Sequence, residues 1–251
     1  MLSLRQSARG LITLDTLLYS ALSTTHLLWA GSLLLEPWRY VGKPIIPALF
    51  AFVHIIAALA ILGRYRTYGG WLSVTILSYY WMFIKPREPI AEPQSVGILA
   101  ISAVLLMPHV QRLVKNRFPP DINLLAIRLG IAYPFLEWGL DALRNPIHFR
   151  FYFQGNPLTQ FIIAAWNPAT VILLLASFEV GIAFLHVLGL VSRVASLGAL
   201  IALIVFSSVA GYPLALPQDI ALGAAAAYLM KKGPGIFSMD HVFRRIVNSS
   251  F

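Results

Sequence analysis

The stretch Phe178–Asp240 decides the fold of this chain. It begins FEVGIAFLHVLGLVSR (residues 178–193), continues through an apolar run and ends GYPLALPQDIALGAAAAYLMKKGPGIFSMD (residues 211–240). Three apolar segments follow one another with only a few residues between them, and a basic Gly-Pro-Gly sequence closes the last. A soluble protein has too little interior to bury three such segments in succession, whereas a bilayer accommodates them. The stretch therefore predicts a membrane-embedded helical unit.

The composition extends this conclusion to the whole chain. Of its 251 residues, 58% are hydrophobic and 12% are charged, about half the charged share of a soluble domain. The net charge of +9 does not indicate nucleic-acid binding, because the basic residues lie at the ends of apolar runs, where they contact lipid headgroups. Cysteine is absent, which excludes disulfides, thiolate metal sites, cysteine-ligated iron–sulfur clusters and thiol nucleophiles. The class is a polytopic all-α membrane protein.

The apolar runs and the charges between them predict the topology. We predict eight membrane-spanning helices, at residues 11–35, 45–63, 69–84, 95–110, 122–143, 167–188, 194–211 and 217–231. Because the third, fourth and eighth are short, six or seven spans with a re-entrant segment are the alternative. Twelve basic residues lie at the termini and in the loops after the even-numbered spans, and six lie in the other loops. The excess predicts a multi-pass protein of the plasma membrane with both termini in the cytoplasm.

The chain also contains an internal repeat of about half its length. The matching features are Trp29 with Pro37 and Trp138 with Pro146, the Leu-Gly pairs at 62–63 and 188–189, and the segments PIAEPQS at 89–95 and PLALPQD at 213–219. Three anchors in the same order predict two parallel four-helix units, residues 1–120 and 121–251. The alternative is that apolar helices resemble one another by composition alone.

Ionisable side chains inside spans are costly and require a partner or a function. Arg128 lies roughly 9 Å and Glu179 roughly 13–14 Å from the inner ends of their spans, so a long arginine reaches the carboxylate. We expect a buried Arg128–Glu179 ion pair, with His186 and Arg193 nearer the inner surface. The pair either contributes to binding or only holds two helices together.

A second group of ionisable residues is predicted nearer the outer surface. Glu137 and Asp141 share one helix face, so their carboxylates repel each other unless one is protonated or a cation such as Arg144 is close. Asp219 follows Leu-Pro-Gln at the start of the last span, where it either caps the helix or joins the same site. We predict a proton-exchange or ligand site at Glu137 and Asp141.

The histidines give no prediction of a haem or metal site. A b-type haem needs two axial ligands at similar depth. His26 lies roughly 22 Å and His54 roughly 13–14 Å from the inner side, and His186 is shallower still. We therefore expect no haem and no metal site on this chain.

Three runs together resemble the DoxX/DoxD-like membrane proteins, a group that includes the membrane subunit of thiosulfate:quinone oxidoreductase. They are LAIRLGIAYPFLEWGLDAL (125–143), FEVGIAFLHVLGLVSRVASL (178–197) and PQDIALGAAAAYLMKKGPGIFSMD (217–240). The recurring positions of that family correspond to Arg128, Gly139, Glu179, Gly189, Arg193, Asp219, Gly233, Gly235, Ser238 and Asp240. One position departs from the family pattern, since Ala142 stands where a basic residue often follows.

The resemblance implies four-helix units and an association with quinone-linked redox chemistry. We expect a membrane subunit of a quinone-linked oxidoreductase, with other subunits as electron-donating partners. In this interpretation Glu137 and Asp141 exchange protons with quinone, and Arg128, Arg144, Glu179, His186 and Asp219 line or hold the site. A structural accessory subunit and a small-molecule or ion transporter are the alternatives.

Overall fold

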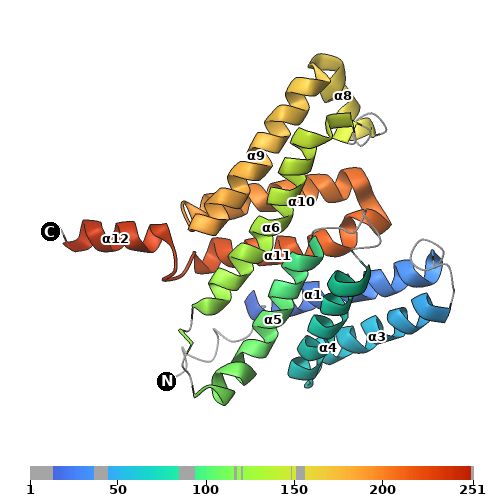
Figure 1. Cartoon of the computed structure of the whole chain (residues 1–251), viewed down its shortest axis with the longest axis vertical. Coiled ribbons are helices and arrows are strands. Elements are labelled where there is room, and N and C mark those ends of the chain that lie inside the picture. Colours follow the sequence, from blue (N-terminus) through green and yellow to red (C-terminus); the bar gives the residue numbers. More distant parts are fainter. Residues whose placement is uncertain are drawn as a thin grey trace, which may run out of the picture.

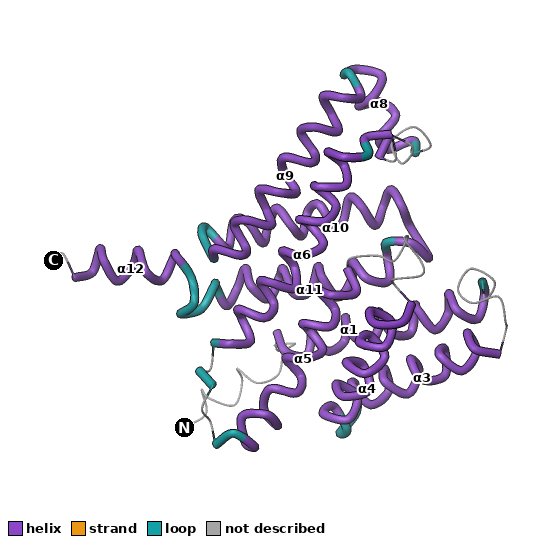
Figure 2. Tube along the Cα trace, in the orientation of Figure 1, coloured by secondary structure: helices purple, strands orange, loops and turns teal. Residues whose placement is uncertain are grey.

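The computed structural model describes residues 14–36, 45–84, 94–115, 118–119, 121–147, 149–150 and 156–249, and the regular structure in them is helical (Figures 1 and 2). The helices are α1 (Leu14–Leu35), α3 (Ile45–Leu62), α4 (Arg66–Tyr79), the π-helix η1 (Tyr80–Ile84), α5 (Gln94–Leu113), α6 (Ile122–Arg144), α8 (Pro157–Ala165), α9 (Pro168–Leu188), α10 (Ser192–Leu214), α11 (Leu216–Lys232) and α12 (Met239–Ser249). The predicted all-α class is confirmed.

Each of the eight apolar segments in the sequence coincides with a helix. The third is divided, because α4 continues directly into η1. Three of the described helices, α5, α9 and α10, are long and apolar enough to cross a membrane. Many apolar side chains on them face outward, as expected for helices in contact with lipid. The helices α8 and α12 had not been predicted.

One apolar core joins the two halves of the chain. α1 packs against α3 and α11, and α6 packs against α9 and α5. At the centre, a Cβ on Gly97 of α5 would lie 2.5 Å from the carbonyl oxygen of Gly130 in α6 and would also overlap Leu222 of α11. Only glycine at this position allows the three helices to approach so closely.

Most of the basic side chains in the described part of the chain lie toward one end of the bundle, which we call the basic end. The Arg66 guanidinium lies over the Tyr19 ring, 4.9 Å from its centroid, and Asp15 pairs with Tyr228 near the end of α11. These contacts bring the α3–α4 turn and the start of α1 beside the last turns of α11. The basic residues at this end lie in the α3–α4 turn and the start of α4, at the end of α5 and just after it, at the start of α10, at the end of α11 and in α12: Arg64, Arg66, Arg112, Lys115, Arg193, Lys231, Lys232, Arg244 and Arg245.

Candidate functional site

At the basic end, Arg128 holds three segments of chain together. Its Nη1 donates to the carbonyl of His186 over 3.3 Å, and its Nη2 donates to the carbonyl of Phe237. The guanidinium packs directly against Gly189, which ends α9 in the left-handed conformation at φ 65°. Arg128 therefore joins the start of α6 to the end of α9 and to the connection between α11 and α12.

Asp240 completes the same junction. Its carboxylate accepts hydrogen bonds from the backbone N–H groups of Val191 (2.8 Å) and Ser192 (3.0 Å), at the start of α10. Its own N–H donates to the carbonyl of Gly189 over 3.1 Å. A carboxylate at a helix N-terminus is stabilised by the helix dipole, and Asp240 also attracts the Arg128 guanidinium. These residues act in folding, by fixing how the helices of the second half connect.

The predicted Arg128–Glu179 ion pair is not formed. Glu179 is fully buried, and neither of its carboxylate oxygens has a hydrogen-bond partner among the described residues. The arginine side chain extends instead toward the end of α9, seven residues or about 10 Å beyond Glu179. The Glu179 carboxyl group is thus buried but forms no hydrogen bond that would hold the described helices together.

His186 is buried and forms two hydrogen bonds within the second half of the chain. Its Nδ1 lies 2.9 Å from the Ile182 carbonyl of its own helix, and its Nε2 lies 3.2 Å from Ser196 Oγ of α10. Because a carbonyl only accepts, Nδ1 carries the proton and Nε2 accepts from the serine. Both nitrogens of the buried ring are therefore engaged, and the Nε2 contact with Ser196 joins α9 to α10.

One of the two sequence-based alternatives, that Asp219 caps α11, is wrong. The N-cap is Ala215, and Asp219 lies within the first turn, where it is buried. Its Oδ2 accepts from Ser207 Oγ of α10 over 2.9 Å, and the side chain of Gln94 from α5 lies beside the same carboxylate. Asp219 thus links α11 to α10 and to the first half of the chain.

Glu137 belongs to a chain of polar and aromatic contacts between α6 and η1. Tyr133 Oη donates to Glu137 Oε1 over 2.5 Å, and the Tyr133 ring meets the edge of Trp81, with 5.8 Å between centroids. Trp81 Nε1 donates in turn to Ser95 Oγ over 2.8 Å. Trp81 lies in the π-helix, a distortion that occurs often at functional sites.

The residues around Glu137 and Asp219 lie at one depth. Gln94, Asp219 and Tyr133 are each three residues, or about one turn, from the crossing of Gly97, Leu222 and Gly130. They lie on the side away from the basic end, which we call the outer side. We call this group the outer polar cluster. Its members are Trp81, Gln94, Ser95, Tyr133, Glu137, Ser207 and Asp219.

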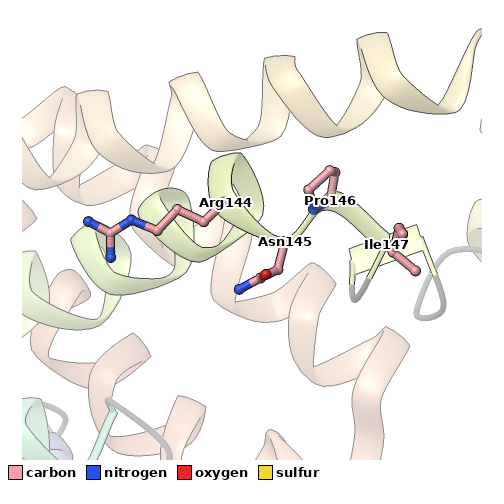
Figure 3. A pocket seen from close by; sticks show the side chains of 4 residues that line it. All are labelled: Arg144, Asn145, Pro146 and Ile147. Atoms are coloured by element: carbon pink, nitrogen blue, oxygen red, sulfur yellow. The ribbon is translucent and has the colours of Figure 1, made fainter.

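Asp141 lies one turn beyond Glu137 and receives a different partner from the one predicted. Asn145 Nδ2 donates to Asp141 Oδ1 over 2.8 Å. Arg144, the expected cation, is exposed and forms no ion pair with a described residue. It lines a hollow of about 490 Å³ at the end of α6, together with Asn145, Pro146 and Ile147 (Figure 3). Asn145 therefore connects the Asp141 carboxylate to this hollow.

The first half contains a buried polar chain that the sequence analysis missed. His26 Nδ1 lies 2.7 Å from His54 Nδ1, and His26 Nε2 lies 2.7 Å from Ser73 Oγ. Ser73 Oγ lies 2.6 Å from Ser102 Oγ, and Ser102 donates to the Ile98 carbonyl over 2.7 Å. This histidine–serine chain joins α3, α1, α4 and α5, so the polar residues are not concentrated in the second half.

The prediction that His26 and His54 lie at different depths in the membrane is wrong. Their depths were counted from the ends of two helices, and those ends are not level with each other. The two rings are in contact, with centroids 5.0 Å apart, and both lie against Trp29. Among the described residues, no group of three or more His, Asp or Glu could hold a metal ion.

No protein-family model, curated protein or solved structure matches this chain. The DoxX/DoxD-like resemblance of the motifs therefore stays a prediction, and the functional argument depends on the geometry of the outer polar cluster.

Proposed function

We propose that this chain is an integral membrane subunit of a quinone-linked oxidoreductase and that its outer polar cluster exchanges protons with the quinone headgroup. The observation that carries the proposal is the continuous set of contacts from Asp219 to Glu137. Glu137, Asp141 and Asp219 lie within the outer half of an apolar bundle. They accept hydrogen bonds from the neutral side chains of Tyr133, Asn145 and Ser207, respectively. Such costly groups are retained in membranes where a proton or a polar ligand is handled.

Two four-helix units account for how the cluster is built. In the first half, Trp81 donates to Ser95 at the start of α5, and in the second half Ser207 donates to Asp219 at the start of α11. The two donors, Trp81 and Ser207, are 126 residues apart in sequence, and the two acceptors, Ser95 and Asp219, are 124 apart. Both separations are close to the offset between the PQS and PQD motifs. Equivalent hydrogen bonds at equivalent helix starts support an internal duplication with eight spans. The cluster would then lie between the two units.

The residues of the cluster have the chemistry that reduction of a quinone requires. Reduction to the quinol takes up two electrons and two protons, and the protons would pass through Glu137 and Asp141. Tyr133 and Asn145 orient these two carboxylates by hydrogen bonds. The rings of Trp81 and Tyr133 offer flat apolar surfaces for an aromatic headgroup. The electrons would come from a partner subunit, because this chain has no cysteine to ligate a cluster.

The proposal is tested by purifying the full chain in mild detergent, extracting bound quinone and labelling with a photoreactive quinone. Labelled peptides should come from α6 or η1, and Glu137→Gln should reduce labelling and the quinone reductase activity of the complex by at least about tenfold. Ser208→Ala is the matched control, because Ser208 is exposed and bonds only to Ile204 of its own helix. Absence of extractable quinone, with labelling spread over lipid-facing helices, would contradict the proposal.

A structural accessory subunit is the second candidate, and a specific observation favours it. At the basic end, Arg128, Gly189 and Asp240 are engaged with backbone groups and serve only to connect helices. If the complex retains full activity with Glu137→Gln and Asp141→Asn combined, this second function is the better one. Flux of a solute or ion in proteoliposomes that the same variants abolish would instead establish a transporter.

A further inference from the structure

The last helix, α12, has no buried residue and stands clear of the other helices (Figure 1). It begins at the basic end, where the chain leaves α11 and passes Phe237 and Asp240. Beyond its first turn, where Asp240 bonds to the start of α10, no side chain of α12 is buried. A short helix with so few tertiary contacts is only marginally stable in water, so α12 requires a surface to pack against.

The surface must be apolar and flat, because α12 is strongly amphipathic. At about 100° per residue, its apolar side chains fall in one arc of about 140°. The arc is made of Met239, Val242, Phe243, Ile246 and Val247, all of them exposed. Asn248 and His241 lie on the opposite side of the helix.

The polar side of α12 and its surroundings are basic. Arg244 and Arg245 flank the polar face, and Lys231 and Lys232 close the preceding helix. Two acids lie nearby: Asp121 accepts a hydrogen bond from Ile236 N–H, and Asp240 accepts from the start of α10. The four basic side chains outnumber them, so this surface stays basic. Clustered Lys and Arg side chains beside a spanning helix attract anionic lipid headgroups.

The depth of α12 is fixed by its attachment. Asp240 bonds to Gly189, Val191 and Ser192, in the turn between α9 and α10. These two helices are both long and apolar enough to cross a membrane, so the turn between them lies where hydrocarbon gives way to headgroups. The N-terminus of α12 is therefore held at the lipid headgroup level rather than at a distance from the bilayer.

We propose that α12 is a binding element for the anionic phospholipid surface on the basic side of the membrane. The apolar arc enters the boundary of the hydrocarbon, and Arg244 and Arg245 contact lipid phosphates. This inference is independent of the proposed quinone function, because it concerns only the contact between α12 and lipid.

Single-cysteine variants of the full chain test the proposal, because the natural sequence has no cysteine. Phe243→Cys and Asn248→Cys are each labelled with a nitroxide. Each labelled protein is placed in nanodiscs of phosphatidylcholine alone and in nanodiscs that also contain phosphatidylglycerol. With the anionic lipid, the label at 243 should become several-fold more accessible to oxygen than to a water-soluble nickel chelate. The label at 248 should stay accessible to the chelate. Added Arg244→Gln and Arg245→Gln should remove the effect of phosphatidylglycerol.

Two results would overturn the proposal. Equal accessibility to the chelate at 243 and 248 in both lipids would show that α12 remains in water. Protection at 243 that rises with the number of protein copies per nanodisc, and not with phosphatidylglycerol, would show that the apolar arc binds a second copy of this chain instead.

Discussion

At the residue scale, the last acceptor of the histidine–serine chain determines where every proton in it lies. Ser102 gives its single proton to the Ile98 carbonyl, so Ser73 must donate to Ser102. His26 Nε2 must then donate to Ser73, which leaves His26 Nδ1 as the acceptor for His54 Nδ1–H. We therefore predict opposite tautomers, Nδ1–H in His54 and Nε2–H in His26, in the neutral protein.

Nitrogen-15 NMR of the histidine-labelled full chain checks this assignment. The His54 ring should show a protonated Nδ1, and the His26 ring should show a protonated Nε2. Ser73→Ala removes the acceptor of His26 and should lower the free energy of unfolding by about 1–3 kcal/mol. Thr75→Ala is the control, because the Thr75 hydroxyl is exposed and bonds only to Trp71 of its own helix. Identical tautomers in both rings would contradict the assignment.

The contacts of Arg128 lead to a prediction about its coupling to Glu179. Arg128→Ala removes two hydrogen bonds from a buried charged donor and should cost about 3 kcal/mol or more. Because Glu179 takes no part in those bonds, the effects of Arg128→Ala and Glu179→Gln should add within about 0.5 kcal/mol. Denaturant unfolding of the two single variants and the double variant in detergent measures this. A coupling energy of several kcal/mol would instead show that Arg128 and Glu179 form an ion pair.

At the element scale, the end of α9 depends on a glycine that no other residue can replace. Gly189→Ala would place a Cβ against the Arg128 guanidinium and 2.5 Å from Ser238 Cβ, at a positive φ. We expect a loss of at least about 2 kcal/mol in the free energy of unfolding. Gly181→Ala, in the same helix with no atom near the added Cβ, should be neutral or stabilising. Equal effects of the two substitutions would show that the left-handed turn is not required.

The helices could be predicted from the sequence, whereas the pairing of their side chains could not. A long apolar run determines that a helix forms, and α9 was predicted to within one residue at its start. Depth along a helix axis gives no information about side-chain direction, which is why Arg128 was assigned to Glu179 although it points the other way. The predicted depths of His26 and His54 were wrong because neighbouring helices start at different levels. The sequence singled out Glu137 and Asp219, but it gave no signal for their hydrogen-bond partners Tyr133 and Ser207.

At the scale of the whole molecule, the two halves share one core and contribute to the same polar cluster. α5 of the first half contacts α6 of the second, and α11 of the second contacts α1 of the first. Neither half keeps its inner faces covered without the other. This reciprocal packing explains why Gln94 lies beside Asp219 although they are far apart in sequence. An isolated second half should therefore not form the outer polar cluster.

The number of crossings can be decided by which residues share a side of the membrane. With eight spans, α10 and α11 both cross, so Arg193 and Lys232 lie on the same side and Arg144 lies on the other. If only α5, α9 and α10 cross, Arg193 and Lys232 lie on opposite sides.

Arg144→Cys, Arg193→Cys and Lys232→Cys in this cysteine-free chain can be labelled with a membrane-impermeant maleimide in intact cells and in inverted vesicles. We expect only the Arg144 position to react in intact cells, because the positive-inside rule predicts that the basic end lies in the cytoplasm. Labelling of Arg193→Cys and Lys232→Cys from opposite sides would exclude the eight-span arrangement. Labelling of both from outside would keep the arrangement but reverse its orientation.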